Sequence, residues 1–330
     1  MNQQLDIGDM TIVRIREAAA RIAPYAHRTP VMTSKTLDQI AGRDLFFKCE
    51  MFQKVGAFKF RGACNAIMKL SPEVAARGVV THSSGNHAQA VALAAKLRSI
   101  AAHIVMPRNS SAVKIRAVEG YGAKIYLCEP NTASREGTAQ KIADETGATL
   151  IPPYNHPDII AGQGTAALEL MEEVADLDII IAPVGGGGLM SGTCIASKGM
   201  MPDIRIIGAE PKGADDAAQS LAAGRIIPQS NPKTIADGLL TSLGELTWAI
   251  IRDHVERIIT VSEDEIVAAM RLVWERMKII IEPSSAVAVA VALSEEFKSG
   301  ASDAKRIGVI LSGGNVDLDR LPWVVNANSR

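Results

Sequence analysis

A single lysine stands within a glycine-rich and apolar stretch of this chain. The stretch runs from Gly56 to Ala63, reads GAFKFRGA, and follows a strand-like run at residues 45–50, with Lys59 at its centre. Burial disfavours the charged ammonium form, so a lysine in such surroundings has a lowered pKa and can act as an amine nucleophile. The same pattern is also compatible with a lysine whose stem lies on apolar neighbours while its ammonium group reaches water.

Three polar, glycine-containing turns could complete a reactive site around this lysine. They are Ser83 to His87, Gly185 to Gly188, and Ser312 to Asn315, and each follows a strand-like run. The first turn offers hydroxyl, amide and imidazole groups at a helix N-terminus, which suits a carboxylate, although the same residues are typical of a simple helix cap. Because ligands collect beyond the carboxyl ends of strands in α/β sheets, we expect the three turns to meet in one crevice.

The four consecutive glycines predict an anion-binding turn. Glycine lets the backbone approach a phosphate closely, and the free N–H groups of the following helix favour negative charge. A tight turn between a strand and a helix is the plainer alternative. A dinucleotide fingerprint is excluded, because Met190 stands where the GxGxxG spacing from Gly185 and Gly187 requires glycine.

Strand-like and helix-like runs alternate along the chain, which predicts parallel sheets with helical crossovers. A first series has strands at 79–83, 101–106, 124–128 and 149–151, and helices at 86–97, 111–119 and 132–145. A second series has strands at 178–184, 205–209, 257–261 and 306–311, and helices at 163–174, 189–198, 262–277 and 283–297. The pattern fits two α/β domains.

Composition narrows the class of protein. The chain has 330 residues, of which 47% are hydrophobic and 22% charged, so it can bury a sizeable core. Its net charge of -1 gives no reason to expect nucleic acid or an anionic membrane as partner. The four cysteines are scattered and predict reduced, buried thiols, while the polar N-terminus and interrupted apolar runs predict neither a signal peptide nor a membrane span. We expect a cytoplasmic protein.

Seven ordered motifs give these residues a family context. In this light the chain resembles the fold-type II enzymes that use pyridoxal phosphate, and most closely the group of serine racemases and serine/threonine dehydratases. The resemblance covers nearly the whole chain and rests on FKCE at 47–50, THSSGNH at 81–87, AGQGT at 161–165, PVGGGG at 183–188, IADG at 235–238, IEP at 281–283 and LSGGNVD at 311–317.

The resemblance implies a two-domain α/β fold like that of the tryptophan synthase β subunit. Each domain would be a mostly parallel sheet flanked by helices. The large, cofactor-binding domain would comprise residues 1–68 and 151–330, and the small domain residues 69–150. The similar enzymes also imply a homodimer.

The resemblance further implies which residues would hold the cofactor. Lys59 would form a Schiff base with pyridoxal phosphate and remove the Cα proton on one face of the substrate, with Ser84 on the opposite face. Asn86 would bond the phenolic oxygen of the cofactor, and Ser312 would face its pyridine nitrogen. Phe58 would pack along the cofactor ring. The phosphate would be held by Gly185, Gly186, Gly187 and Gly188.

The implied reaction is serine racemisation together with dehydration of L-serine or L-threonine. Racemisation needs a proton-transfer group on each face of the Cα and dehydration needs only one, so Ser84 makes racemisation feasible without establishing it. The substrate carboxylate would lie among Ser83, Ser84, His87, Arg135 and Ser242. If Arg135 binds a second carboxylate, the protein would instead be a threo-3-hydroxyaspartate dehydratase. The sequence is also compatible with a threonine deaminase and with a non-catalytic nucleotide-binding α/β module.

A second site is implied at Glu210, Ala214 and Asp216. Two carboxylates and a carbonyl oxygen suit a hard divalent cation, Mg²⁺ or alternatively Ca²⁺ or Mn²⁺, although an ordinary acidic turn would have the same composition. The similar racemases also bind ATP between subunits, and Gln89, Tyr121 and Asn315 match contact positions there. Val55 and Ala57 stand where the family usually has hydroxyl residues, which affects fine positioning of the cofactor.

Overall fold

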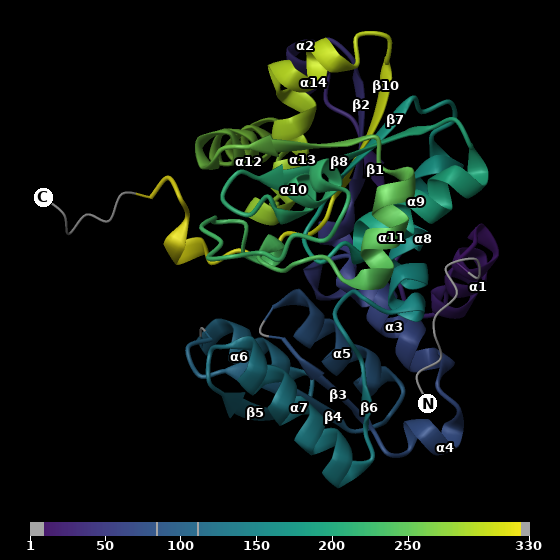
Figure 1. Cartoon of the computed structure of the whole chain (residues 1–330), viewed down its shortest axis with the longest axis vertical. Helices are drawn as coiled ribbons and strands as arrows, with labels where there is room; N and C mark the ends of the chain where they lie inside the picture. The colour runs from purple at the N-terminus through teal and green to yellow at the C-terminus, as the bar shows by residue number, and fades with distance from the viewer. Residues whose placement is uncertain (1–9, 84, 111, 325–330) are drawn as a thin grey trace, which may run out of the picture.

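The computed structural model describes residues 10–83, 85–110 and 112–324, and shows two α/β domains, one above the other in Figure 1. Each domain is built on one β-sheet. Within the described residues every strand pair is parallel except that of β1 with β2. The predicted two-domain α/β fold with mostly parallel sheets is therefore confirmed.

The larger sheet combines strands from both ends of the chain. Its order is β1-β2-β10-β7-β8-β9. Strands β2 and β10 are parallel neighbours, with Asp44 opposite Arg306 and Cys49 opposite Leu311, so the segments that follow them leave the same edge side by side. The six strands are β1 (Val31–Met32), β2 (Asp44–Cys49), β7 (Ile179–Pro183), β8 (Arg205–Pro211), β9 (Arg257–Val261) and β10 (Arg306–Leu311).

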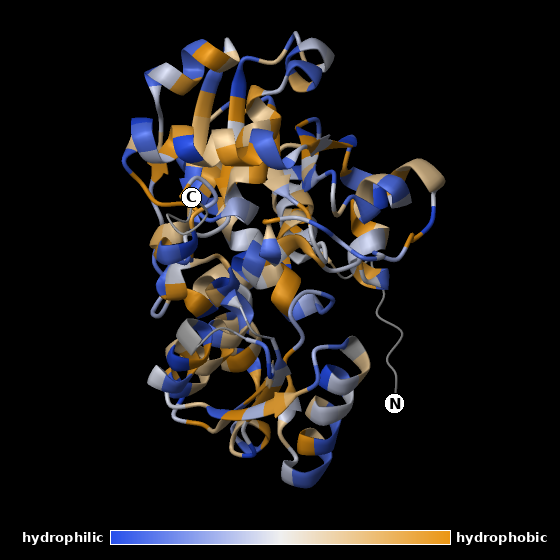
Figure 2. Cartoon of the chain, turned by 90° about the vertical axis from the view of Figure 1, so that its left-hand side faces the viewer, coloured by the Kyte–Doolittle hydropathy of each residue, from blue (hydrophilic) through white to orange (hydrophobic). Residues whose placement is uncertain are grey.

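Both faces of this sheet are covered, which explains why its strands are continuously apolar. In β7, Ile179 and Ile181 pack in the cluster formed with α12 and α13, while Ile180 and Ala182 pack in the cluster with α8 and α9. Figure 2 shows these strands as an orange interior. The surrounding helices are α1 (Ile12–Ile22), α2 (Lys35–Ala41), α8 (Pro157–Glu173), α9 (Gly188–Met200), α10 (Asp216–Ala223), α11 (Glu245–His254), α12 (Glu263–Met277), α13 (Pro283–Leu293) and α14 (Glu295–Gly300).

The smaller sheet is made from one continuous part of the chain, in the order β5-β4-β3-β6. On one face Val79 and Ile104 pack with residues of α3, α5 and α6, and on the other Val80 and Val105 pack with residues of α7. Its strands are β3 (Val79–His82), β4 (Ala102–Pro107), β5 (Lys124–Cys128) and β6 (Thr149–Leu150). The helices around it are α3 (Lys59–Lys69), α4 (Pro72–Ala75), α5 (Asn86–Leu97), α6 (Ala112–Gly120) and α7 (Thr132–Thr146).

Two predicted helices have different limits in the structure. Helix α8 begins at Pro157, six residues before the predicted start at residue 163, with His156 accepting the Asp158 N–H at its cap. The helix predicted at 283–297 is two helices, because Ser294 adopts an extended conformation. Its hydroxyl then accepts the N–H of Phe297 and starts α14.

Short 3₁₀ helices lie at Glu50–Phe52, Lys54–Gly56, Asp237–Leu239 (η4) and Leu318–Arg320. All four cysteines are buried and form no disulfide, as predicted. Among the described residues, none of the helices has both the length and the apolar character that crossing a bilayer requires. The N-terminal residues 1–9, where we predicted no signal peptide, lie outside the described part of the chain.

Candidate active site

Backbone contacts join the lysine stretch to the turn that follows β10. The N–H of Phe58 donates to the carbonyl oxygen of Ser312 at 3.0 Å, and Ala57 forms an antiparallel bridge with Gly313. Lys59 comes next, as the first residue of α3. Two of the segments predicted to meet, distant in sequence, therefore form one local structure at the carboxyl edge of the large sheet.

The side chain of Lys59 has the surroundings that an amine nucleophile needs. Its Nζ donates a hydrogen bond to the carbonyl oxygen of Pro153 at 2.9 Å and lies 5.1 Å from the centre of the Phe58 ring. Burial lowers the pKa of Lys59 to about 8, and the nearby carboxylate of Glu282 opposes this shift. A useful fraction of the amine is therefore unprotonated close to neutral pH.

The four glycines connect the end of β7 to the start of α9. Gly187 has φ 84°, a left-handed conformation that favours glycine, and a Cβ there would lie 2.8 Å from the side chain of Leu243. A Cβ at Gly186 would overlap the ring of Tyr154. The first N–H groups of α9 have no carbonyl partner within the helix, so this turn offers donors and a positive dipole end to an anion.

The turn before α5 gathers polar groups at the N-terminus of that helix. The N–H of Gly85 donates to Oγ of Ser83 at 3.3 Å. Asn86 is the first residue of α5, and its Nδ2 donates to both carboxylate oxygens of Glu282, at 3.0 and 3.1 Å. Ser84, which we predicted to act on the second face of the substrate, lies outside the described residues.

His87 is a buried, neutral imidazole. Its Nε2 lies 3.0 Å from the carbonyl oxygen of Ile151, which can only accept, so the ring proton is assigned to Nε2. Burial, reinforced by the positive charge of Lys59, lowers the pKa of His87 to about 3. Its Nδ1 is then a bare acceptor, buried and with no partner among the described residues. His87 consequently supplies no positive charge to a carboxylate.

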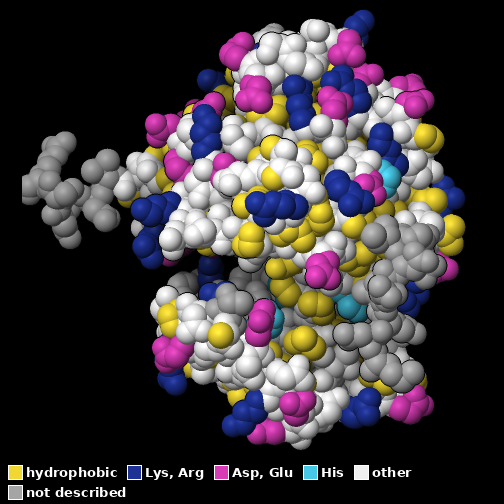
Figure 3. Space-filling view, viewed as in Figure 1, with side chains coloured by type: hydrophobic (Ala, Val, Ile, Leu, Met, Phe, Trp, Pro, Cys, Tyr) yellow, Lys and Arg dark blue, Asp and Glu magenta, His cyan; other side chains and the backbone are white. Residues whose placement is uncertain are grey.

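A cavity of about 550 Å³ lies between α7 and the segment that leads from β6 into α8. His82, Glu136 and Tyr154 line it together with Pro153, whose carbonyl holds Lys59. Figure 3 shows the surface hollowed where the two domains meet. Arg135 stands on α7 beside Glu136, and its Nε is buried with no hydrogen-bond partner among the described residues. The predicted carboxylate-binding arginine thus retains an unused donor close to this cavity.

Two buried carboxylates stand at the predicted cation site. Glu210 accepts the N–H groups of Ala217 at 3.1 Å and Ala218 at 2.7 Å. Asp216 Oδ1 accepts from Nε2 of Gln229 at 3.1 Å, whereas its Oδ2 is buried with no partner among the described residues. Burial raises the pKa of Glu210 well above its ordinary value and that of Asp216 to about 6. A cation would offset the cost of ionising both groups.

Ala214, the third residue predicted for the cation site, and Ser242, which was predicted for the substrate pocket, both lie near these carboxylates. Ala214 is buried in the turn after β8, where its N–H donates to the carbonyl oxygen of Pro211. Ser242 Oγ accepts the N–H of Gln229 at 2.8 Å. In the described part of the chain no group of three or more His, Cys, Asp or Glu residues could hold a metal ion. A cation at Glu210 and Asp216 would therefore need carbonyl oxygens and water.

Glu282 is a residue of this site that the sequence did not reveal. It precedes α13, is only 4% exposed, and binds Asn86 as described above and the N–H of Asn315 at 3.2 Å. The side-chain amide of Asn315 in turn donates to Asn86 Oδ1 at 2.9 Å and to the carbonyl oxygen of Val55 at 2.7 Å. The IEP motif contains Glu282, but the pattern alone attached no role to it.

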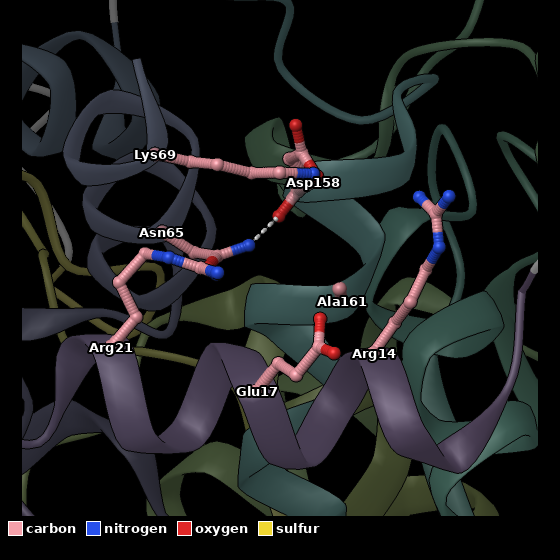
Figure 4. Close-up of a pocket in the computed structure, with 7 residues that line it drawn as sticks. All are labelled: Arg14, Glu17, Arg21, Asn65, Lys69, Asp158 and Ala161. Atoms are coloured by element: carbon pink, nitrogen blue, oxygen red, sulfur yellow. Dashed lines mark hydrogen bonds and ion pairs between the residues drawn. The ribbon is translucent and has the colours of Figure 1, made fainter. Parts of the chain in front are cut away.

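A second cavity, of about 270 Å³, lies between α1, α3 and α8 and is drawn in Figure 4. Four of its charged and polar residues bind one another in pairs: Lys69 pairs with Asp158 at 2.6 Å, and Arg21 donates to Asn65 at 2.6 Å. The Asn65 side chain donates in turn to the backbone carbonyl of Asp158. This cavity holds none of the residues predicted for chemistry, so we assign the active site to the region of Lys59.

These residues fit pyridoxal phosphate. Lys59 supplies a partly unprotonated amine, the glycine turn supplies backbone donors in space that no Cβ could share, and Phe58 lies beside the amine. Ser312 is hydrogen-bonded to the lysine stretch through its backbone carbonyl. Asn86 is hydrogen-bonded to Asn315, which follows Ser312 in the same turn. The donor set therefore matches a phosphate, an aromatic ring and an aldehyde.

Comparisons with known proteins agree with this assignment. The chain is 55% identical over 306 residues to serine racemase of Oryza sativa subsp. japonica, covering 92% of this chain and 90% of that protein. It is 52% identical over 306 residues to beta-hydroxyaspartate dehydratase of Paracoccus denitrificans (strain Pd 1222), covering 93% and 96%. The structure of maize serine racemase superposes with a TM-score of 0.93 at 55% identity, covering 94% of each chain.

The family profile described as pyridoxal-phosphate dependent enzyme matches residues 22–313. That span includes Lys59, the glycine turn and Ser312. The chain therefore belongs to the family of pyridoxal-phosphate dependent enzymes.

Proposed function

We propose that the protein is a serine racemase that also dehydrates L-serine and L-threonine, releasing ammonia. The observation that carries the proposal is the buried amine of Lys59, whose pKa is lowered to about 8 and which is close enough to His87, in the turn before α5, to affect the pKa of that imidazole. The high identity to serine racemases over nearly the whole chain supports it.

Bound pyridoxal phosphate would supply the electron sink that stabilises negative charge on the substrate Cα. Lys59 would carry the cofactor and move the Cα proton on one face, and Ser84 would move it on the other. The glycine turn would hold the phosphate, Asn86 the phenolic oxygen, and Ser312 would face the ring nitrogen. A hydroxyl does not enforce protonation of that nitrogen as a carboxylate would, which favours rapid loss of the β-hydroxyl.

Substrate binding is proposed at the mouth of the cavity of about 550 Å³. Ser83 and the N–H groups at the start of α5 would receive the α-carboxylate, with His87 as a neutral acceptor beside them. Arg135 and Ser242 would complete the pocket. The unused Nε donor of Arg135 specifically favours a second candidate, a threo-3-hydroxyaspartate dehydratase, because that substrate carries a second carboxylate. Threonine carries no second carboxylate, so its deamination would not need the positive charge of Arg135.

The remaining expectations extend the proposal. We infer Mg²⁺, or Ca²⁺ or Mn²⁺ in its place, at Glu210, the Ala214 carbonyl and Asp216. A homodimer and stimulation by ATP through Gln89, Tyr121 and Asn315 are inferred from the same resemblance. The domain limits, 1–68 with 151–330 and 69–150, stay a prediction, as does the cytoplasmic location.

One substrate panel tests the proposal. The cofactor-loaded protein would be incubated with both enantiomers of serine, with L-threonine and with threo-3-hydroxyaspartate, followed by keto-acid assay and chiral analysis. Racemisation of serine with some pyruvate formation is expected. Exclusive turnover of hydroxyaspartate would move the assignment to the second candidate. No bound cofactor and no turnover would favour a non-catalytic nucleotide-binding module.

A further inference from the structure

Glu282 binds two other segments of the active site. Its carboxylate accepts the Asn86 amide at 3.0 and 3.1 Å and the N–H of Asn315 at 3.2 Å, while its own N–H donates to the carbonyl oxygen of Gly313 at 3.0 Å. Asn86 starts α5 beside the small sheet, whereas Gly313 and Asn315 follow the last strand of the large one. One buried carboxylate therefore connects groups from both domains.

The fit around this carboxylate is close. A Cβ at Gly313 would lie 3.0 Å from Oε1 of Glu282 and 3.0 Å from the Cβ of Ala57, so both glycine and carboxylate belong to the same packed arrangement. Ala57 in turn lies two residues before Lys59. A substitution at position 282 should therefore alter the packing of both the lysine stretch and the start of α5.

Glu282 and Asn315 together determine the orientation of the Asn86 amide. A carboxylate can only accept, so the NH₂ end of Asn86 must face Glu282. The NH₂ group of Asn315 can only donate, and it contacts Oδ1 of Asn86 at 2.9 Å. Without the carboxylate, only the hydrogen bond from Asn315 would oppose rotation of the amide.

We propose that Glu282 is a positioning residue of the active site, which fixes the Asn86 amide toward the cofactor and sets the charge beside Lys59. This inference rests on the proposed function for the role of Asn86, but not on the identity of the substrate. Glu282 itself touches neither substrate nor reacting atoms in the proposal. It acts through Asn86 and through its electrostatic effect on the lysine amine.

The charges around Glu282 make its effect depend on pH. Burial raises the pKa of Glu282 to about 7, the Asn86 hydrogen bond lowers it, Asp237 of η4 raises it, and Lys114 of α6 lowers it. Asp237 and Lys114 are themselves paired at 2.6 Å across the two domains. Lys59 faces the carboxylate from α3 and is held more strongly protonated when Glu282 is ionised. As the pH rises through about 7, the carboxylate gains its charge and both of its acceptor oxygens become available to Asn86 and Asn315.

The test uses Glu282→Gln, which keeps the size of the side chain and removes the charge. In the apoprotein we expect the pH midpoint for covalent capture of pyridoxal phosphate by Lys59 to fall below that of the unchanged protein, because the opposing negative charge is gone. In the holoenzyme the visible absorption of the cofactor should change and kcat should fall about 10- to 100-fold, the range for losing a charged hydrogen bond, with KM little altered. Glu295→Gln, which removes an exposed carboxylate paired with Lys298, is the matched control and should change none of these.

Unchanged capture midpoint and cofactor spectrum in Glu282→Gln would overturn the inference, even if the variant lost thermal stability. If that variant does not fold, Glu282→Asp is measured instead, and retention of the midpoint with a changed spectrum is expected, because the charge remains while its reach to Asn86 shortens. A Glu282→Asp protein with both properties unchanged would overturn the inference as well. These readouts need no turnover, so a protein inactive on the whole substrate panel would refute the proposed function while the capture midpoint still decides the role of Glu282.

Discussion

Nζ of Lys59 donates to the carbonyl oxygen of Pro153 at 2.9 Å, so the nucleophile is held by the segment that leads from β6 into α8. The amine must leave this carbonyl and lose its proton before it can attack an aldehyde. Reactivity of the apoprotein toward pyridoxal phosphate therefore depends on both the position and the protonation of one side chain.

Replacing the lysine should abolish covalent cofactor binding. In Lys59→Ala the phosphate turn remains, so the cofactor should still bind but should not be fixed to the protein by borohydride, and racemisation and elimination should both be lost. Mass spectrometry after reduction measures the first effect and chiral analysis the second. Lys54→Ala serves as control, because the ammonium group of Lys54 lies over the Phe60 ring. Near-normal turnover in Lys59→Ala with added cofactor would contradict the assignment.

Cofactor capture by the apoprotein should accelerate with rising pH. The pKa of Lys59 is lowered to about 8, so the free amine is the minor form at pH 7 and the major form at pH 9. Because the folded state disfavours the ammonium form, this lysine also contributes less stability as the pH falls from about 10.5 through about 8. Stopped-flow absorbance across this pH range measures the rate. A midpoint at the ordinary lysine value would show that the amine is not buried in solution.

A divalent cation should stabilise the folded protein through Asp216. With Mg²⁺ at 100 times its dissociation constant, the free energy of unfolding should rise by about 2.7 kcal/mol. The pKa of Asp216 is raised to about 6, so its ionisation costs the cation-free fold stability as the pH rises from about 3.8 to about 6, and cation binding should strengthen over the same interval.

Asp216→Asn should abolish this stabilisation, whereas Asp215→Asn should retain most of it. Asp215 is matched because it is a neighbouring carboxylate whose side chain already binds Gln219. Thermal unfolding with and without chelator, at pH 5 and pH 7.5, gives the comparison. Equal stabilisation of both variants would remove Asp216 from the cation site.

Ser84→Ala should separate the two proposed activities. Loss of the hydroxyl deletes one proton-transfer group and leaves Lys59 in place, so racemisation should fall about 10²- to 10⁴-fold in both directions. Elimination from L-serine should survive, and elimination from D-serine should fall with racemisation. Kinetics on both enantiomers with solvent deuterium incorporation check this. Equal losses of racemisation and L-serine elimination would mean that Ser84 mainly binds the carboxylate.

Arg61 should be essential for stability rather than for chemistry. It lies on α3, the helix that begins at Lys59, is fully buried, and pairs with Glu50 and Glu169, each at 2.7 Å. Arg61→Met leaves the buried Glu50 carboxylate without its arginine and removes one of the two cations paired with Glu169, the other being Lys48, and should cost about 3–5 kcal/mol in the free energy of unfolding.

Arg28→Met is the matched control for Arg61→Met. Arg28 pairs with Glu172 at 2.9 Å on the surface, and exposed pairs contribute about 0–1 kcal/mol. Urea unfolding of both variants measures the difference. A loss at Arg61 as small as that at Arg28 would mean that the buried pairs are readily replaced by packing.

The fold was most predictable where the signal was local. The apolar run at 306–311 predicted the limits of β10, since a strand buried on both faces needs no polar alternation. The start of α8 was predicted too late because Gly162 and Gly164 weaken a helix in isolation. In the structure a Cβ at Gly162 would lie 2.6 Å from the carbonyl oxygen of Arg61, so these glycines permit close helix packing that the sequence alone does not express.

The residues of the site were likewise predictable only where the sequence signal was local. Lys59 and the glycine turn were recognisable because each is a short segment with distinctive composition. Glu282 was not, since its environment depends on Asn86 and Asn315, which are close only after folding. The position of the ring proton of His87 likewise depends on the Ile151 carbonyl, a contact between segments distant in sequence.

Strand β2 pairs with β10, with Asp44 opposite Arg306. The large sheet can therefore be completed only after almost the whole chain has been synthesised. The smaller sheet, whose strands lie between Val79 and Leu150, has all its partners in one continuous stretch and can form first. Until the last strand emerges, the apolar side chains of β2 lack their cover and its edge lacks a partner. The early part of the nascent polypeptide therefore exposes apolar surface and an unpaired strand edge, which favour aggregation.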